Sequence, residues 1–120
     1  SLENGRLKVS RIVAAADCGD QPHPDIARQQ IEGGLVFGLA MAMGCAAEYH
    51  AGMPKRALLG RMGLPQLADI GEISVKIMDS TAEPGGVGQI GVPAVAPAIA
   101  NALYTVTGRR HRALPLVKPT

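Results

Sequence analysis

Aromatic side chains are scarce in this 120-residue sequence, which has no tryptophan, one phenylalanine and two tyrosines. Hydrophobic residues nevertheless make up 47% of the chain, so alanine, valine, leucine, isoleucine and glycine must form the core. Because these side chains are small, we expect helices and strands to approach one another closely. The length corresponds to one domain or part of one.

Charge and cysteine are equally limited. The net charge of +2 is too small to indicate a nucleic-acid partner or a membrane surface. Cys18 and Cys45 are far apart, and no histidine lies at metal-ligand spacing. We interpret them as ordinary small side chains in a reducing compartment, and we predict no metal ligands. No signal peptide is visible, and no apolar run approaches the ~20 residues of a membrane helix. Since the sequence begins with Ser1, we expect the natural N-terminus to lie upstream.

The first half of the chain predicts a strand followed by a long helix. Residues 7–16 alternate in their first half, which is typical of a strand, and residues 17–24 contain glycine and prolines typical of a turn. Residues 25–43 carry apolar side chains near helical spacing, and Gly44 is placed to end that helix. Gly33, Gly34 and Gly38 interrupt it at ~1 kcal/mol each, which is tolerable where another element packs tightly.

The second half predicts a hairpin, a strand and a second helix. The hairpin would pair residues 46–50 with 56–59 around a turn at 51–54, and residues 70–78 alternate as a strand does. Residues 94–107 follow as a helix with Pro93 in its first turn. This order predicts an α+β fold in which a small mixed sheet is covered by two helices.

A glycine-dense loop, residues 83–93, precedes the second helix and has four glycines between Gly85 and Gly91. Glycine lets a backbone turn tightly and approach a ligand. A helix N-terminus presents free N–H groups and the positive end of a dipole, which favour anionic or electron-rich groups. Gln89 is the one functional side chain in the middle of this loop, so we expect ligand contact here.

The string from Gly86 to Gly91 also matches the dinucleotide pattern G-x-G-x-x-G. That fingerprint requires a strand ending at the first glycine and a second strand after the helix. Here five or more residues separate the predicted strand from Gly86, and a basic tail follows the helix. We therefore reject this reading.

Three segments, taken in order, resemble the molybdenum hydroxylases, the family of xanthine dehydrogenase and aldehyde oxidoreductase. The first segment is Asp17-Cys18-Gly19 with Pro24-Asp25-Ile26, Gln29-Gln30-Ile31-Glu32-Gly33-Gly34 and Phe37-Gly38-Leu39. The second is Pro84-Gly85-Gly86-Val87-Gly88 with Gly91-Val92-Pro93 and Ala96-Pro97-Ala98-Ile99-Ala100-Asn101-Ala102. The third is Thr107-Gly108-Arg109 with Leu114-Pro115-Leu116. The likeness covers residues 7–116 and is strongest to the isoquinoline 1-oxidoreductase type of beta subunit. It implies that the chain is the C-terminal part of a large molybdopterin-binding subunit.

The resemblance implies a molybdenum–molybdopterin cofactor and an oxidoreductase that hydroxylates an aromatic N-heterocycle or an aldehyde, with water as the oxygen source. Gln30 matches a glutamine beside the cofactor, where an amide can both donate and accept hydrogen bonds. The small positions that follow it correspond to Gly33 and Gly34. The loop expected to line the metal site consists of Gly85, Gly86, Val87 and Gly88.

Gln89 departs from the family pattern, which usually has a glutamate there acting as the base. A carboxamide has the same shape but cannot serve as a base near neutral pH. Three interpretations follow: a relative with weak or altered activity, an enzyme that uses another base such as Glu32 or Glu83, or a non-catalytic paralogue.

Family subunits are several times longer than this chain, so we expect residues 1–120 to be a single C-terminal fragment that alone binds no cofactor and exposes apolar surface. The implied partners are the rest of the large subunit and a small subunit with iron–sulfur clusters. The rival hypothesis is a non-catalytic cofactor-binding or assembly module. Bacterial cytoplasm and periplasm both remain open as the compartment.

Overall fold

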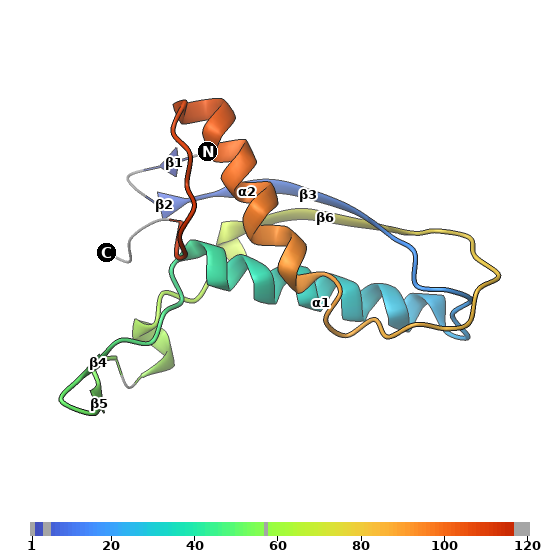
Figure 1. Ribbon diagram of the computed structural model, residues 1–120, viewed down its shortest axis with the longest axis horizontal. Coiled ribbons are helices and arrows are strands. Elements are labelled where there is room, and N and C mark those ends of the chain that lie inside the picture. The colour runs from blue at the N-terminus through green and yellow to red at the C-terminus, as the bar shows by residue number, and fades with distance from the viewer. Residues whose placement is uncertain (1, 4–5, 57, 117–120) are drawn as a thin grey trace.

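A parallel pair of strands with a helix between them in sequence forms the centre of the molecule. The computed structural model describes residues 2–3, 6–56 and 58–116. Strand β3 (Val9–Ala16) pairs in parallel with β6 (Ile70–Ile77), and Val9 lies opposite Ile70. Helix α1 (Pro24–Met43) packs against β6, and helix α2 (Val92–Thr107) crosses α1 (Figure 1).

The remaining elements are short. They are the strands β1 (Leu2–Glu3), β2 (Arg6–Leu7), β4 (Tyr49–His50) and β5 (Met53–Pro54), and the 3₁₀ turns η1 (Leu59–Arg61) and η2 (Leu67–Asp69). Strand β1 pairs antiparallel with β2, and β4 pairs antiparallel with β5.

Both helices begin and end where the sequence indicates. Each has a proline in its first turn, where the missing N–H has no intrahelical partner to lose. Gly44 ends α1 with φ 116°, and Gly108 ends α2 with φ 68°. These left-handed conformations suit glycine, and each N–H caps its helix by donating to Ala40 or Tyr104 respectively.

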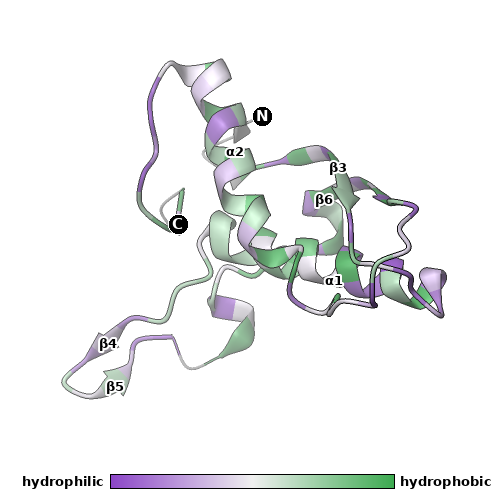
Figure 2. Ribbon diagram, turned by 45° about the vertical axis from the view of Figure 1, so that its right-hand side comes forward, coloured by the Kyte–Doolittle hydropathy of each residue, from purple (hydrophilic) through white to green (hydrophobic). Residues whose placement is uncertain are grey.

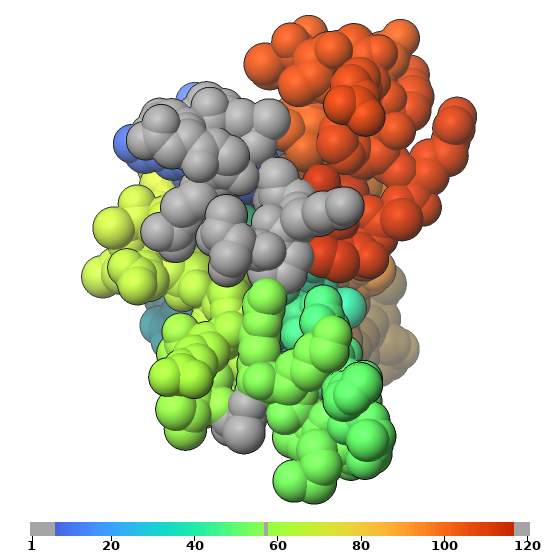
Figure 3. Space-filling view, turned by 90° about the vertical axis from the view of Figure 1, so that its left-hand side faces the viewer, coloured from blue at the N-terminus to red at the C-terminus, as the bar shows by residue number. Residues whose placement is uncertain are grey.

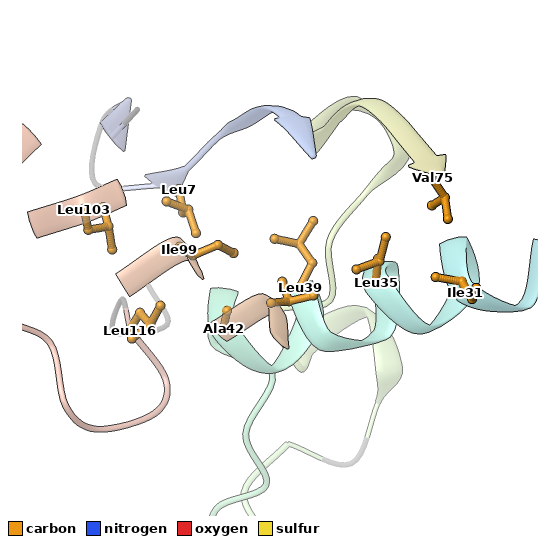
Figure 4. Packing of buried hydrophobic residues seen from close by; sticks show 10 residues of the cluster. Leu7, Ile31, Leu35, Leu39, Ala42, Val75, Ile99, Leu103 and Leu116 are labelled. Atoms are coloured by element: carbon orange, nitrogen blue, oxygen red, sulfur yellow. The ribbon is translucent and has the colours of Figure 1, made fainter. Parts of the chain in front are cut away.

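The core is aliphatic and lies where the two helices cross beneath the strands. Leu39 and Ala42 of α1 lie near Ile99 of α2, while Ile31 of α1 lies beneath Val75 of β6, as Figure 4 shows. Figure 2 shows hydrophobic residues gathered at this crossing. The chain ends contribute as well, because Leu7 and Leu116 are buried and the Leu116 N–H donates to the Ala42 carbonyl over 3.0 Å.

The close approach expected from the small side chains is present. A Cβ on Gly38 would lie 2.5 Å from the Val92 carbonyl oxygen and 3.0 Å from the Val95 side chain. Since no real Cβ fits at 2.5 Å, glycine at this position sets how near α2 comes to α1.

The α+β class is confirmed, and within the described residues parallel and antiparallel pairing is distributed over three two-stranded sheets. The predicted hairpin occurs, but its second strand is wrong. Strand β5 is Met53–Pro54, inside the segment expected to turn, and Leu59 begins a 3₁₀ turn. The actual turn is Ala51–Gly52, where both residues have positive φ. Residue 57 of the predicted strand lies outside the described residues.

The segment that holds β4 and β5 extends away from the body of the molecule (Figures 1 and 3). Large hydrophobic side chains are exposed along and beside it, including Met53 at 70%, Leu59 at 72% and Leu67 at 88%. Exposed apolar surface was expected from the sequence, and it is present here.

Candidate functional site

The glycine loop leaves β6 and runs beside α1 to the start of α2 (Figure 1). Its first anchor is the Asp17–Asp20 turn. The Gly85 N–H donates to the Cys18 carbonyl over 2.8 Å, and the Asp20 N–H donates to the Ala82 carbonyl over 2.9 Å. Two segments more than sixty residues apart in sequence are thereby held side by side.

Asp17 anchors the start of the turn that the sequence predicts over residues 17–24. Its Oδ1 accepts the Gly19 N–H over 3.3 Å, which is the local bond that aspartate makes to the backbone two residues on. Gly19 has φ 74°, and a Cβ there would collide with the Glu83 carbonyl oxygen. Glycine is therefore required at position 19 both for its conformation and for the close passage of the loop.

Gln21 is a residue that the sequence reasoning missed. Its Nε2 donates to the Cys18 carbonyl over 2.5 Å and to the Gly85 carbonyl over 3.2 Å. One amide thus joins the Asp17 turn to the glycine loop. The position of Gln21 directly after a turn motif is the one local feature that could have pointed to it. Its partner at position 85 could not be predicted from the neighbouring sequence.

The second anchor of the loop lies on α1. A Cβ on Gly91 would be 2.9 Å from the Ile31 carbonyl oxygen and 3.1 Å from the Leu35 nitrogen. A Cβ on Gly34 would be 3.6 Å from the Gly88 carbonyl oxygen. Gly34 and Gly88, two predicted site residues, are therefore brought into contact.

Other predicted site positions face open space. A Cβ on Gly33, Gly86 or Gly88 would have no neighbouring atom within 4 Å. Gln30 is exposed and lies one helical turn before Gly34, so its side chain belongs to the stripe of α1 that borders the loop. Gln30, Gly33 and Gly34 on α1, with Gly86 and Gly88 on the loop beside it, are together called the open cradle below.

Gly85 and Val87 play a different part from the open glycines. Gly85 is bonded to the Asp17 turn through its N–H and its carbonyl, as described above. Val87 is half-buried and packs against the hydrophobic core. Both residues therefore hold the loop in place.

Gln89 lies at the entrance to α2. Its carbonyl accepts the Val92 N–H over 3.1 Å, while the residue as a whole is exposed. The backbone thus takes part in starting the helix, and the carboxamide is free to meet a ligand. Of the two carboxylates considered as substitutes, Glu83 is exposed and Glu32 is half-buried. Glu32 lies two positions after Gln30, about 200° around α1, so it points away from the Gln30 stripe.

In the described part of the chain, no three or more histidine, cysteine, aspartate or glutamate residues gather as metal ligands would. Neither helix within these residues has the length and apolarity to cross a membrane. Cys18 is buried and Cys45 half-buried, and both are free thiols.

Comparison with known protein families shows which family this chain belongs to. The sequence profile described as "Molybdopterin cofactor-binding domain" matches residues 1–71, which is more than half of the chain. The chain belongs to the molybdopterin cofactor-binding domain family. The resemblance inferred from the three sequence segments is therefore confirmed.

Relatives of this domain include two bacterial oxidoreductase chains. The beta subunit of isoquinoline 1-oxidoreductase from Brevundimonas diminuta is 30% identical over 92% of this chain. A protein named membrane-bound aldehyde dehydrogenase [pyrroloquinoline-quinone], from Gluconacetobacter polyoxogenes, is 32% identical over 93% of it. The chain spans only 14% of the length of either relative.

The fold is also found in a solved structure. The crystal structure of Cu,Mo-CO dehydrogenase in its carbon monoxide reduced state superposes with a TM-score of 0.74 at 26% identity. The superposition covers 86% of this chain and 14% of that one. The arrangement of β3, α1, β6 and α2 is therefore that of a molybdopterin-binding domain.

Proposed function

We propose that this chain is part of the large subunit of a molybdenum-cofactor oxidoreductase that hydroxylates an aromatic N-heterocycle or an aldehyde, with water as the oxygen source. The observation that carries the proposal is the open cradle between α1 and the glycine loop in a member of the molybdopterin cofactor-binding family. The two relatives named above are an isoquinoline oxidoreductase and an aldehyde dehydrogenase, which supports both substrate classes.

The residues present suit a bulky, polar cofactor. The three open glycines leave room that any side chain would occupy, while Gly85, Val87 and Gly91 hold the loop against the Asp17 turn, the core and α1. The exposed amide of Gln30 can donate to a phosphate or oxo oxygen and accept from a pterin N–H. Gly34, whose neighbour is the Gly88 carbonyl, keeps helix and loop close enough for one ligand to touch both.

When bound, the molybdenum cofactor supplies the two-electron oxidation that places a water-derived oxygen on carbon. The chain's own residues bind and orient. Gln30, Gly33 and Gly34 would contact the cofactor from the helix, and the Gly85–Gly88 segment would line the site from the loop. Gln89 would face the substrate from the start of α2.

The chemistry of Gln89 limits what this chain can contribute. Its carboxamide can donate to and accept from a substrate, so it can position one. It cannot take a proton near neutral pH, and loss of a general base commonly costs about 10²–10⁴-fold in rate. We infer that the protein in its natural length is either a slow hydroxylase or one that takes its base from elsewhere.

The proposed assembly follows from how little of its relatives the chain spans. The cofactor site would be completed by other parts of a larger subunit, and this segment would lie toward the C-terminal end of that subunit. Electrons would leave through iron–sulfur clusters on a partner subunit or domain.

Gln89 also supports a second candidate, a non-catalytic cofactor-binding or assembly module. Such a module would keep the cradle and lack the base, and the open glycines together with Gln89 support it.

The test is the molybdenum and pterin content of the natural-length protein purified from its source. Near-stoichiometric molybdenum with turnover of an aldehyde or heterocycle supports the enzyme. Molybdenum without turnover supports the module. Absence of molybdenum, from cells whose other molybdoenzymes are loaded, contradicts the enzyme and points to a non-catalytic relative or an assembly module. Quinone should be assayed in the same sample, because one relative's name carries that cofactor.

A further inference from the structure

One face of α1 is exposed and carries no charge. It presents the side chains of Ile26, Phe37 and Met41, which are 57%, 62% and 42% exposed. Because successive residues of a helix are about 100° apart, these three side chains point within about 60° of one another, and Gln30 points between them. The charged residues of α1 lie at least about 100° away around the helix, and they are Asp25, Arg28 and Glu32.

The loop that carries Gln89 lies beside this face. Gly88 and Gly91 both approach Gly34, where a Cβ would be 3.6 Å from the Gly88 carbonyl oxygen and 3.7 Å from the Gly91 Cα. The turn between these two glycines, which holds Gln89, is therefore kept next to Gly34. Phe37 follows Gly34 by three positions, and side chains three positions apart are neighbours on a helix surface. Phe37 thus lies beside the turn that presents Gln89.

Phe37 is the one phenylalanine of the sequence, and its exposure contrasts with the buried aliphatic core. An aromatic ring at the surface offers a flat face on which another aromatic ring can stack. The neighbouring Gln89 amide can donate a hydrogen bond to a ring nitrogen. Ile90, which is 40% exposed in the same turn, adds apolar surface. With no charged group on this face of α1, the surroundings suit a neutral, planar ring.

We propose that Phe37 is a specificity-determining residue of the substrate site, where its ring stacks on a planar aromatic N-heterocycle held beside Gln89. This inference rests on the proposed function in placing the substrate next to Gln89. It selects the heterocycle over an aliphatic aldehyde, because an aliphatic chain has no aromatic face for the ring to meet.

Equilibrium dialysis of isoquinoline with the natural-length protein tests the proposal. Phe37→Leu keeps an apolar side chain but removes the ring, and it should weaken isoquinoline binding by about 2- to 12-fold, the loss expected for one aromatic pair. Phe37→Tyr keeps the ring and should bind isoquinoline within about twofold of the unaltered protein. Unchanged affinity in Phe37→Leu, or an equal loss in Phe37→Tyr, would overturn the proposal.

Two comparisons show whether the effect is stacking at this site. Tyr49→Leu removes an aromatic side chain of similar exposure, 68%, from β4, outside the cradle, and should leave isoquinoline binding unchanged. Cyclohexanecarbaldehyde, whose ring is saturated and not planar, should compete with isoquinoline with an affinity that Phe37→Leu changes by less than about twofold. Equal losses for the two compounds, or from the two substitutions, would overturn the proposal.

The midpoint of urea unfolding separates contact with a ligand from packing within the protein. If the ring meets only a ligand, Phe37→Leu should leave the midpoint of the ligand-free protein where Tyr49→Leu leaves it. A midpoint lower than in Tyr49→Leu would mean that another part of the longer subunit covers Phe37, and would overturn the proposal.

Molybdenum content keeps this test separate from that of the proposed function. Absence of molybdenum in the unaltered protein contradicts the enzyme, while dialysis of isoquinoline still decides the role of Phe37. Near-stoichiometric molybdenum without isoquinoline binding is compatible with the enzyme and overturns this inference. A molybdenum content that falls in Phe37→Leu would place the ring against the cofactor instead, and would also overturn it.

Discussion

Gly38 of α1 lies directly against the backbone of Val92, the first residue of α2, with room for no side chain between them. Gly33, little more than one turn earlier on the same helix, has no atom within 4 Å of where a Cβ would be. The same residue type thus serves helix packing at one position and lies on an open helix face at the other.

Alanine at these two positions should act in opposite directions. Gly38→Ala forces α2 away from α1, and overpacking of this kind costs about 1–3 kcal/mol of unfolding free energy. Gly33→Ala removes the conformational cost of glycine in a helix and should stabilise by about 0.5–1 kcal/mol. Urea unfolding of the cofactor-free protein, compared by midpoint at constant slope, measures both. Equal destabilisation by the two substitutions would contradict the difference in packing.

Leucine in the cradle should reduce cofactor retention without disturbing the fold. Gly88→Leu projects into open space where we place the cofactor. A clash costing about 1–3 kcal/mol corresponds to roughly 5- to 150-fold weaker binding. Molybdenum per chain, measured at matched folded content, reports the loss. Gly60→Leu is the control, because Gly60 is equally open but lies in η1, outside the cradle. Full molybdenum content in Gly88→Leu would show that the cofactor does not lie against this loop.

Removing the Gln21 amide should loosen the glycine loop. Gln21→Ala deletes the hydrogen bonds to the Cys18 and Gly85 carbonyls, at a net cost of about 0.5–1.5 kcal/mol each. The Gly85 amide, which donates to Cys18, should then exchange its hydrogen faster. Gln29→Ala, on the exposed surface of α1, controls for the change of residue type. Unchanged exchange at Gly85 would show that the backbone bonds hold the loop unaided.

The elements that the sequence predicted well are those with a long periodic pattern. Strands β3 and β6 and helices α1 and α2 each span eight residues or more, and proline or glycine marks the helix boundaries. Strand β5 was misplaced because two residues carry no periodicity. Ala51, with φ 48°, also adopts a turn conformation that alanine rarely takes.

The candidate site was located from its motifs, whereas its internal geometry required the fold. The sequence presents Gly33, Gly38, Gly88 and Gly91 as equivalent small residues. Only the crossing of α1 with α2 makes Gly38 and Gly91 packing positions and leaves the other two open. The bond from Gln21 to Gly85 likewise joins positions 64 residues apart, a separation at which no local pattern carries information.

Gln89→Glu is the sharpest test of whether this protein is a degraded enzyme. The Gln89 backbone accepts the Val92 N–H, and that bond does not depend on the side chain, so the substitution should leave the fold intact. If the cradle is otherwise competent, a carboxylate here restores a proton acceptor beside the substrate. Hydroxylation by the molybdenum-loaded, natural-length protein should then rise by about 10²–10⁴-fold. The restored rate should increase with pH as the new carboxyl group ionises. Gln29→Glu makes the same charge change on α1, away from the loop, and should gain nothing.

Full activity already present with Gln89, and no gain in Gln89→Glu, would mean that another group is the base. Glu32→Gln and Glu83→Gln would then be compared, and because Glu32 points away from the Gln30 stripe, we expect Glu83→Gln to show the larger loss.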